Sequence, residues 1–217
     1  MSVDQVTSQI RPKAGRPTRE QAEARHHALL ETALDHFLDK GFEQATIEAI
    51  AQAVGMTKRT VYALYPDKVA LFHAALDLAV ERFSVSAERI AETDKGDLHD
   101  TLVAIAWLRV DQVMTPNGLK LQRIINTESY RFPGILRLSF ERSGLPTVRF
   151  LERVLARETA AGRLALDAPD KAAAVFMSMV VGGPVRVIVT GEPLSRQQID
   201  KRIRYAVRLF LDGARPR

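Results

Sequence analysis

The stretch IEAIAQAVGMTKRTVYAL decides the fold of the N-terminal part of the chain and runs from Ile47 to Leu64. Counted from Ile47, an alanine lies at position five (Ala51), a glycine at position nine (Gly55) and a β-branched residue at position fifteen (Val61). Two short helices that cross need a small residue at their contact, a permissive turn between them and an inward wedge on the second helix. This spacing therefore predicts a helix-turn-helix.

The same spacing divides the second helix into two faces. Val61 and Leu64 are expected to point inward, together with Ile50 and Val54 of the first helix. Lysine and arginine contact phosphates or guanine edges, and threonine and tyrosine hydroxyls reach phosphates. The outward face therefore predicts binding to double-stranded DNA, and its alternative is a solvated helix face. The outward residues are Thr57, Lys58, Arg59, Thr60, Tyr62 and Tyr65, and Lys68 is placed for a further phosphate.

The rest of the chain is predicted to be helical as well. Residues 1–19 are polar and form a predicted flexible basic arm, residues 20–67 the helix-turn-helix unit, and residues 68–217 a larger helical region. No segment shows the sustained period of two that is typical of a strand, so the sequence predicts an all-α fold with about nine or ten helices. The helices expected after the helix-turn-helix run from Asp67 towards a break at Gly96, and then over 98–114, 118–131, 134–142, 146–161, 170–190 and 195–212.

Composition restricts the class of protein. The 217 residues are 46% hydrophobic and 26% charged, which fits a soluble globular protein with one large domain or a small domain joined to a larger one. There is no cysteine, so disulfides and thiolate metal sites are excluded. With no secretory signal and no run of ~18 apolar residues, a cytoplasmic protein is expected.

Global charge does not mark the N-terminal part as a DNA binder. The net charge is +5, but residues 1–68 hold nine basic and nine acidic residues, and residues 69–217 carry the whole excess. The prediction of DNA binding therefore depends on local clusters, at Arg11 to Arg19 before the first helix and at Lys58, Arg59 and Lys68.

The stretch RHHALLETALDHFLDKGFEQATIEAIAQAVGMTKRTVYALYPDKVALFHAAL, residues 25–76, resembles the N-terminal domain of the tetracycline-repressor (TetR) family. The resemblance covers about residues 20–80 and implies a three-helix unit that docks in the major groove. The segment GRPTRE, Gly15 to Glu20, is similar to basic arms that family members lay near the minor groove, which adds Arg16. By this resemblance the DNA contacts come from Thr46, Thr57, Lys58, Arg59, Thr60, Tyr62, Tyr65 and Lys68.

The C-terminal two-thirds resembles the ligand-binding and dimerisation region of the same family less specifically. The segment IINTESYRFPGILRLSFERSG, residues 124–144, is similar to an AefR-like subgroup. A pocket for a small-molecule effector is therefore expected, although methionines and aromatics at helical spacing also suit a core, and charged residues among them suit surface ion pairs. The candidate ligand-binding residues are Trp107, Met114, Arg123, Glu128, Phe132 and Met177.

The segment AAAVFMSMVVGGPVRVIVTG, residues 172–191, is apolar on nearly all sides. Such a helix must be buried, either in its own domain or against a second copy of the chain. Together with LPTVRFLERVLARETAAG, residues 145–162, it suits a two-fold four-helix dimer interface, and a central core helix of the monomer is the alternative. A palindromic operator also calls for a homodimer.

Catalytic and cofactor motifs are absent from the sequence. The five histidines show no HxxxH spacing and no supporting carboxylate pattern, so neither a metal site nor a cofactor is expected. The sequence thus predicts a non-enzymatic, homodimeric transcriptional repressor that a small molecule releases from its operator. The alternatives are an all-α enzyme with an accessory N-terminal unit and a DNA-binding dimer without an effector.

Overall fold

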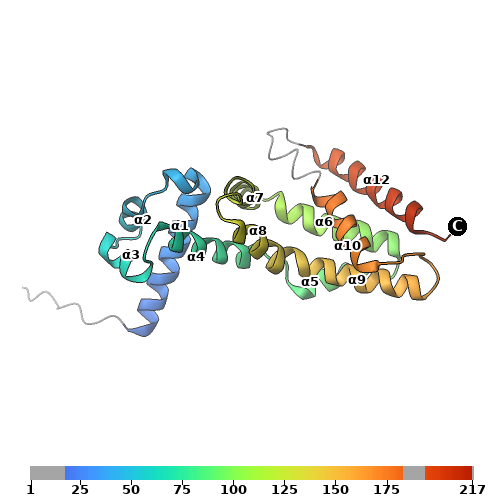
Figure 1. The fold of residues 1–217 in the computed structure, drawn as a ribbon, viewed down its shortest axis with the longest axis horizontal. Coiled ribbons are helices and arrows are strands. Elements are labelled where there is room, and N and C mark those ends of the chain that lie inside the picture. The colour runs from blue at the N-terminus through green and yellow to red at the C-terminus, as the bar shows by residue number, and fades with distance from the viewer. Residues whose placement is uncertain (1–17, 183–193, 217) are drawn as a thin grey trace, which may run out of the picture.

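The computed structural model describes residues 18–182 and 194–216, and every regular element in these ranges is helical (Figure 1). The predicted all-α fold is confirmed. The elements are α1 (Arg19–Gln44), α2 (Ile47–Ala53), α3 (Lys58–Leu64), α4 (Lys68–Arg82), α5 (Ala87–Ala91), α6 (Leu98–Val113), α7 (Pro116–Glu128), α8 (Pro133–Ser139), the π-helical turn η1 (Phe140–Gly144), α9 (Leu145–Ala160), α10 (Pro169–Met177), the π-helical turn η2 (Ser178–Gly182) and α12 (Arg196–Ala214).

The N-terminal unit has the predicted helix-turn-helix geometry. Gly55 adopts φ +67°, a left-handed conformation that suits glycine, in the turn between α2 and α3. Ala51 is 2% exposed and Val61 is fully buried, as the spacing requires. The prediction that Leu64 points inward is wrong, since its side chain is 47% exposed. Leu64 is the last residue of a short helix, and the extended backbone of Tyr65 follows it.

Helix α1 begins one residue before the predicted start of the unit. Thr18 caps it, because its side chain accepts a hydrogen bond from the Gln21 amide at 3.2 Å. Gly41, at φ +77°, interrupts the helical backbone near its end. Most of the predicted arm, with Arg16, lies outside the described residues, and so does the part of the predicted helix 170–190 beyond Gly182.

One hydrophobic core joins the helix-turn-helix to later helices. Phe37 and Phe42 of α1 pack against Phe72 of α4, with ring centroids 4.9 and 4.8 Å apart. Leu121, Ile124 and Ile125 of α7 and Ile135 of α8 complete the same cluster. The N-terminal unit therefore packs continuously onto the rest of the chain, and the domain boundary after residue 67 stays a prediction.

A second core fills the other end of the molecule. It is built from the apolar faces of α6, α9, α10 and α12, which lie together away from α2 and α3 in Figure 1. Leu102, Ile105, Leu151, Phe176 and Ile203 are fully buried there. None of the helices in the described ranges is both long and apolar enough to cross a lipid bilayer.

Two predicted helix boundaries are wrong. The helix expected to run from Asp67 to Gly96 divides, because α4 ends at Arg82 and Ser86 caps a separate α5. The break expected at residues 143–146 is instead the π-helical turn η1, which connects α8 directly to α9. Pro146 has no amide hydrogen for a regular helical bond, and a wider turn absorbs this local mismatch.

Candidate nucleic-acid interface and internal pocket

Helix α3 presents a continuous polar surface. Thr57, Lys58, Arg59 and Thr60 are exposed, and the Tyr62 side chain is 42% exposed. Thr57 caps the helix, since its hydroxyl accepts a hydrogen bond from the Thr60 amide at 3.1 Å. The inward placement of Val61 fixes the orientation of this helix, so the other side chains face solvent as one set.

The two cations of α3 differ in their surroundings. The Lys58 ammonium donates to the Glu48 carboxylate of α2 and lies 5.7 Å from the centroid of the Tyr62 ring. This hydrogen bond lowers the pKa of Glu48 and raises that of Lys58. Arg59 has no hydrogen bond or ion pair to any of the residues that the structure describes. Arg59 is therefore available to a partner, whereas Lys58 shares its charge with Glu48.

Lys68 does not lie on this surface. Its ammonium group donates hydrogen bonds to the main-chain carbonyls of Phe42, Glu43 and Ala45, at 2.8, 3.2 and 3.1 Å, and lies 4.4 Å from the centroid of the Phe42 ring. These bonds satisfy all three ammonium donors at the end of α1. A phosphate contact by this lysine would require these intramolecular bonds to break first.

Tyr65 is also engaged within the protein. Its hydroxyl lies 2.6 Å from Nε2 of His26, and the two rings stack with centroids 5.8 Å apart. Burial raises the pKa of the tyrosine. The Tyr65 side chain thus connects the end of α3 to α1. The sequence had instead predicted that it points outward with the rest of the α3 surface. Thr46 is exposed, and its hydroxyl caps α2 by accepting from the Ala49 amide at 3.2 Å.

A partly open pocket of about 210 Å³ lies where α4, α6, α7, α8 and η1 meet. Leu121 and Ile125 of its lining also belong to the first core, so the pocket wall is continuous with the helix-turn-helix packing. A neighbouring cavity of about 450 Å³ shares Phe83 and Gln112 with it. The pocket lining consists of Val80, Phe83, Arg109, Gln112, Val113, Gly118, Leu121, Gln122, Ile125, Leu136, Ser139, Phe140, Ser143 and Gly144.

Arg109 is the one charged residue in that lining, and it is only 7% exposed. One terminal nitrogen donates to Gln112 Oε1 at 2.5 Å, and both terminal nitrogens lie 3.3 Å from Ser143 Oγ. Burial lowers the pKa of Arg109 to about 10. The turn η1 brings Ser143 to the guanidinium, which shows how the π-helical geometry shapes the pocket.

The six predicted ligand-binding residues are absent from this lining. Trp107 donates to Asp200 Oδ1 at 3.3 Å and stacks with Arg196 between α6 and α12. Phe132 packs between Phe42 and His73 in the first core. The remaining four are placed elsewhere: Met114 and Met177 lie at the second core, Arg123 is exposed and Glu128 is half-buried.

Arg109 was missed although the sequence carries a signal for it. It lies seven residues after Leu102 and four after Ile105, at a position of the apolar stripe of α6. A lone arginine at a core position of an amphipathic helix indicates either a buried ion pair or a ligand-binding charge.

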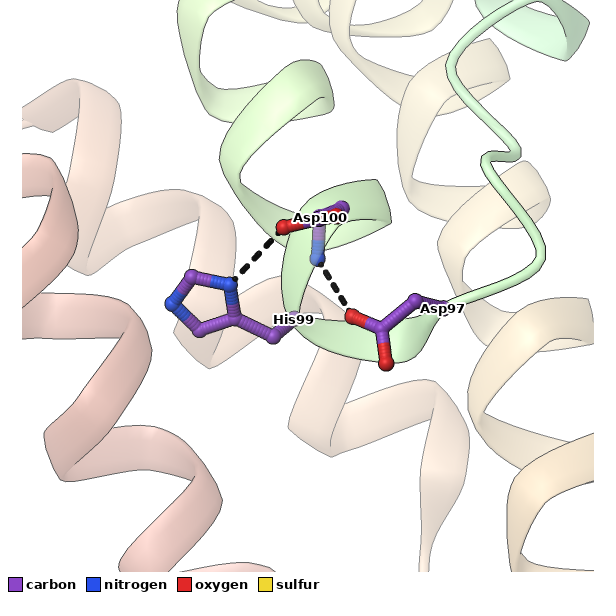
Figure 2. Close-up of side chains that lie close together, drawn as sticks. All are labelled: Asp97, His99 and Asp100. Atoms are coloured by element: carbon purple, nitrogen blue, oxygen red, sulfur yellow. Dashed lines mark hydrogen bonds and ion pairs between the residues drawn. The ribbon is translucent and has the colours of Figure 1, made fainter.

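One cluster of possible metal ligands occurs in the described residues. Asp97, His99 and Asp100 lie together at the start of α6 (Figure 2), so the prediction that no histidine has supporting carboxylates is wrong for His99. Asp97 caps α6 by accepting from the Asp100 amide at 2.9 Å, and His99 Nδ1 lies 3.1 Å from Asp100 Oδ1. The helix cap explains this grouping without a metal ion.

Comparison with family models gives two matches that together cover most of the chain. Residues 29–75 match the model described as bacterial regulatory proteins of the tetR family. Residues 100–213 match that of the C-terminal domain of AefR-like transcriptional repressors, which confirms the predicted subgroup.

Individual proteins are similar over nearly the whole chain. The HTH-type transcriptional repressor Rv1474c of Mycobacterium tuberculosis is 27% identical over 176 residues, covering 80% of this chain and 87% of that protein. The solved structure of the flavonoid-responsive regulator FrrA is 30% identical, covers 90% of this chain and 99% of its own, and has a TM-score of 0.69. A TetR-family regulator from Mesorhizobium loti shares the fold, with a TM-score of 0.76 at 20% identity over 92% of this chain and all of its own.

Proposed function

Because this chain belongs to the TetR family of DNA-binding transcriptional regulators, we propose that it is a cytoplasmic homodimeric repressor that a small molecule releases from its operator. The family consists of regulators, so the chain is a regulator and not an enzyme. The observation that carries the proposal is the α3 surface, where the buried Val61 directs Thr57, Lys58, Arg59, Thr60 and Tyr62 outward.

The outward residues of α3 would enter the major groove, where some would contact base edges and others phosphates. Arg59, free of intramolecular partners among the described residues, would read a guanine edge. Lys58, Tyr62 and the threonine hydroxyls would contact phosphates or neighbouring bases, with Thr46 at the start of α2 adding a phosphate contact. Arg16 would reach the minor groove. Lys68 and Tyr65 position these helices and are left out of the contact set.

A homodimer would form through the C-terminal helices. Val175 of α10 and Tyr205 and Leu209 of α12 are 56, 58 and 53% exposed, which is unusual for large apolar side chains on neighbouring helices. Phe176 and Phe210 hold α10 and α12 together with ring centroids 5.1 Å apart. The apolar residues of α9 are buried within the monomer, so α10 and α12 suit the interface better than α9.

The pocket supports the proposal that the C-terminal region binds a small-molecule effector. It is evidence against the alternative in which this region only forms the dimer. Val80 of α4 and Leu121 and Ile125 of α7 line the pocket, and both helices pack on α1. A ligand that binds better when these helices are shifted would favour a different spacing of the two α3 helices in the dimer. The similarity to FrrA, a regulator named as flavonoid-responsive, agrees with this proposal.

The test is selection of bound sites from a random DNA pool with the full-length protein, followed by sedimentation of the complex. We expect a palindrome with half-site centres about one helical turn of DNA, or a multiple of it, apart, bound by two chains. Screening small molecules for release of the protein from the selected operator tests whether it responds to an effector. Failure to enrich any palindrome, or a complex with one chain per site, would contradict the proposed dimeric repressor.

A further inference from the structure

One charged group in the interior has no charged partner. Within the described residues, the guanidinium of Arg109 donates hydrogen bonds to the neutral oxygens of Gln112 and Ser143, and its Nε is buried without an acceptor. A guanidinium carries five N–H donors, so these bonds leave part of its capacity unused. A buried charge in this state is unfavourable unless another group compensates it.

No carboxylate in the described part of the chain lines the pocket that Arg109 faces. Asp111, two residues after Arg109 on α6, pairs instead with Arg196, at 3.0 Å. Asp77 lies 3.6 Å from Arg142. Within the described ranges, the protein thus supplies a buried cation and places no carboxylate in the lining of its pocket.

We propose that the effector is a small organic acid whose anionic oxygen pairs with Arg109 and whose apolar body lies against Phe83, Leu121 and Ile125. This inference rests on the proposed function, in which the pocket takes an effector. A carboxylate accepts two parallel N–H bonds from a guanidinium, and such charge-assisted bonds are stronger than neutral ones. The volume of about 210 Å³ is below the ~300–1,000 Å³ typical of drug-sized ligands, which favours a one-ring or short-chain acid.

Ser143 acts as a positioning residue in this scheme. Its hydroxyl lies 3.3 Å from both terminal nitrogens of Arg109 and holds the guanidinium in the pocket. An anion that approaches from the pocket side can then take the unused donors while Gln112 retains its own bond. Arg109 itself is only 7% exposed, and these surroundings of low dielectric constant strengthen the ion pair.

The test is calorimetric titration of the full-length protein with matched pairs of probes. Benzoate and trans-cinnamate supply carboxylates, benzamide and cinnamamide are their neutral counterparts, 4-nitrophenolate supplies a phenolate, and inorganic phosphate supplies an anion without an apolar body. We expect each carboxylate to bind about 10- to 150-fold more tightly than its amide. Comparison of benzoate with 4-nitrophenolate identifies which type of anionic oxygen the pocket takes.

The variant Arg109→Met removes the charge and keeps a long apolar side chain. It should weaken benzoate binding by about 10- to 150-fold and leave benzamide within about threefold. Without ligand, it should raise the Tm by at least about 2 °C, because an uncompensated buried charge is removed. Arg109→Lys should retain part of the preference for acids, and Ser143→Ala should weaken it modestly.

Equal binding of acids and amides, absence of acid binding, or an acid affinity unchanged in Arg109→Met would overturn the assignment. Tighter binding of phosphate than of benzoate would also overturn it, because the apolar body would then play no part. Release of the operator is measured separately. Acids that bind through Arg109 without releasing DNA would refute the proposed function alone, and release by neutral compounds only would refute the acid assignment alone.

Discussion

The ammonium group of Lys68 lies 2.8 Å from the carbonyl oxygen of Phe42 and joins the start of α4 to the end of α1. It also bonds the carbonyls of Glu43 and Ala45. Charged donors satisfy carbonyls that would otherwise be left unpaired at a helix end. The lysine therefore stabilises the junction on which the helix-turn-helix is mounted.

Replacement of Lys68 by methionine should lower the free energy of unfolding by about 1–3 kcal/mol, since hydrogen bonds to a charged donor are lost. Denaturant titration measures this change. Lys40→Met is the matched control, because Lys40 is exposed near the same helix end, and it should be neutral. A loss of about one unit in the salt slope of DNA binding at unchanged stability would show instead that Lys68 contacts a phosphate.

Substitution of Tyr65 should affect folding stability, whereas substitution of Tyr62 should affect DNA binding. Tyr65→Phe loses the hydrogen bond to His26 and should cost about 1 kcal/mol of unfolding free energy with operator affinity retained. Tyr62→Phe removes an exposed hydroxyl and should change stability by less than about 0.5 kcal/mol while weakening operator binding. The reverse pattern would mean that the two tyrosines have been assigned the wrong roles.

Arg59→Ala should weaken operator binding by about 1–3 kcal/mol and relax the base preference at one position in each half-site. Competition assays with singly substituted operators measure both effects. Arg149→Ala on α9 removes an exposed cation far along the chain and should leave the preference intact. A uniform loss across all operator variants would reassign Arg59 to a phosphate.

Glu48→Gln should release Lys58 for a phosphate. The salt dependence of DNA binding should then steepen by about 0.9 unit, and affinity at low salt should rise. Asp35→Asn, at an exposed carboxylate of α1, controls for the general loss of negative charge. An unaltered slope in Glu48→Gln would mean that the bond to Glu48 does not limit the phosphate contact of Lys58.

The ion pair of Glu48 and Lys58 makes the folding stability depend on pH, and the direction of this dependence follows from the pKa shift of Glu48. Lys58 lowers the pKa of Glu48 from its ordinary value of 4.5, so the folded state favours the carboxylate. The pair contributes stability above pH 4.5, and this contribution is lost as pH falls through the lowered pKa. The difference in stability between the wild type and Glu48→Gln should therefore vanish under acid conditions. It should be small throughout, because both side chains are exposed.

The sequence predicted those parts of the structure that depend on local spacing. Ala51, Gly55 and Val61 carry independent steric demands within one short stretch, so their roles could be inferred without a structure. The same argument predicted wrongly that Leu64 points inward. Leu64 is the last residue of its helix, where helical periodicity no longer determines burial.

Contacts between distant residues could not be inferred in this way. Lys68 bonds carbonyls 23 to 26 residues earlier, and nothing in its own neighbourhood indicates them. The ligand-binding prediction relied on residue type, and so it chose Trp107 and Phe132, whose partners Asp200 and Phe42 belong to remote helices. Arg109, a charged residue at an apolar position of α6, lines the pocket, whereas the aromatic residues Trp107 and Phe132 do not. In this chain the charge that interrupts the apolar stripe was the better indicator of the pocket.

The shared core of α1 and α4 limits how far this regulator is modular. Phe37 packs on Phe72 at 4.9 Å, and Phe72 lies beyond the predicted end of the DNA-binding unit. A fragment that stops at Asp67 would lose that ring and also the ammonium of Lys68. Engineering a chimera with a new sensor therefore requires a graft that carries α4 along with the first three helices.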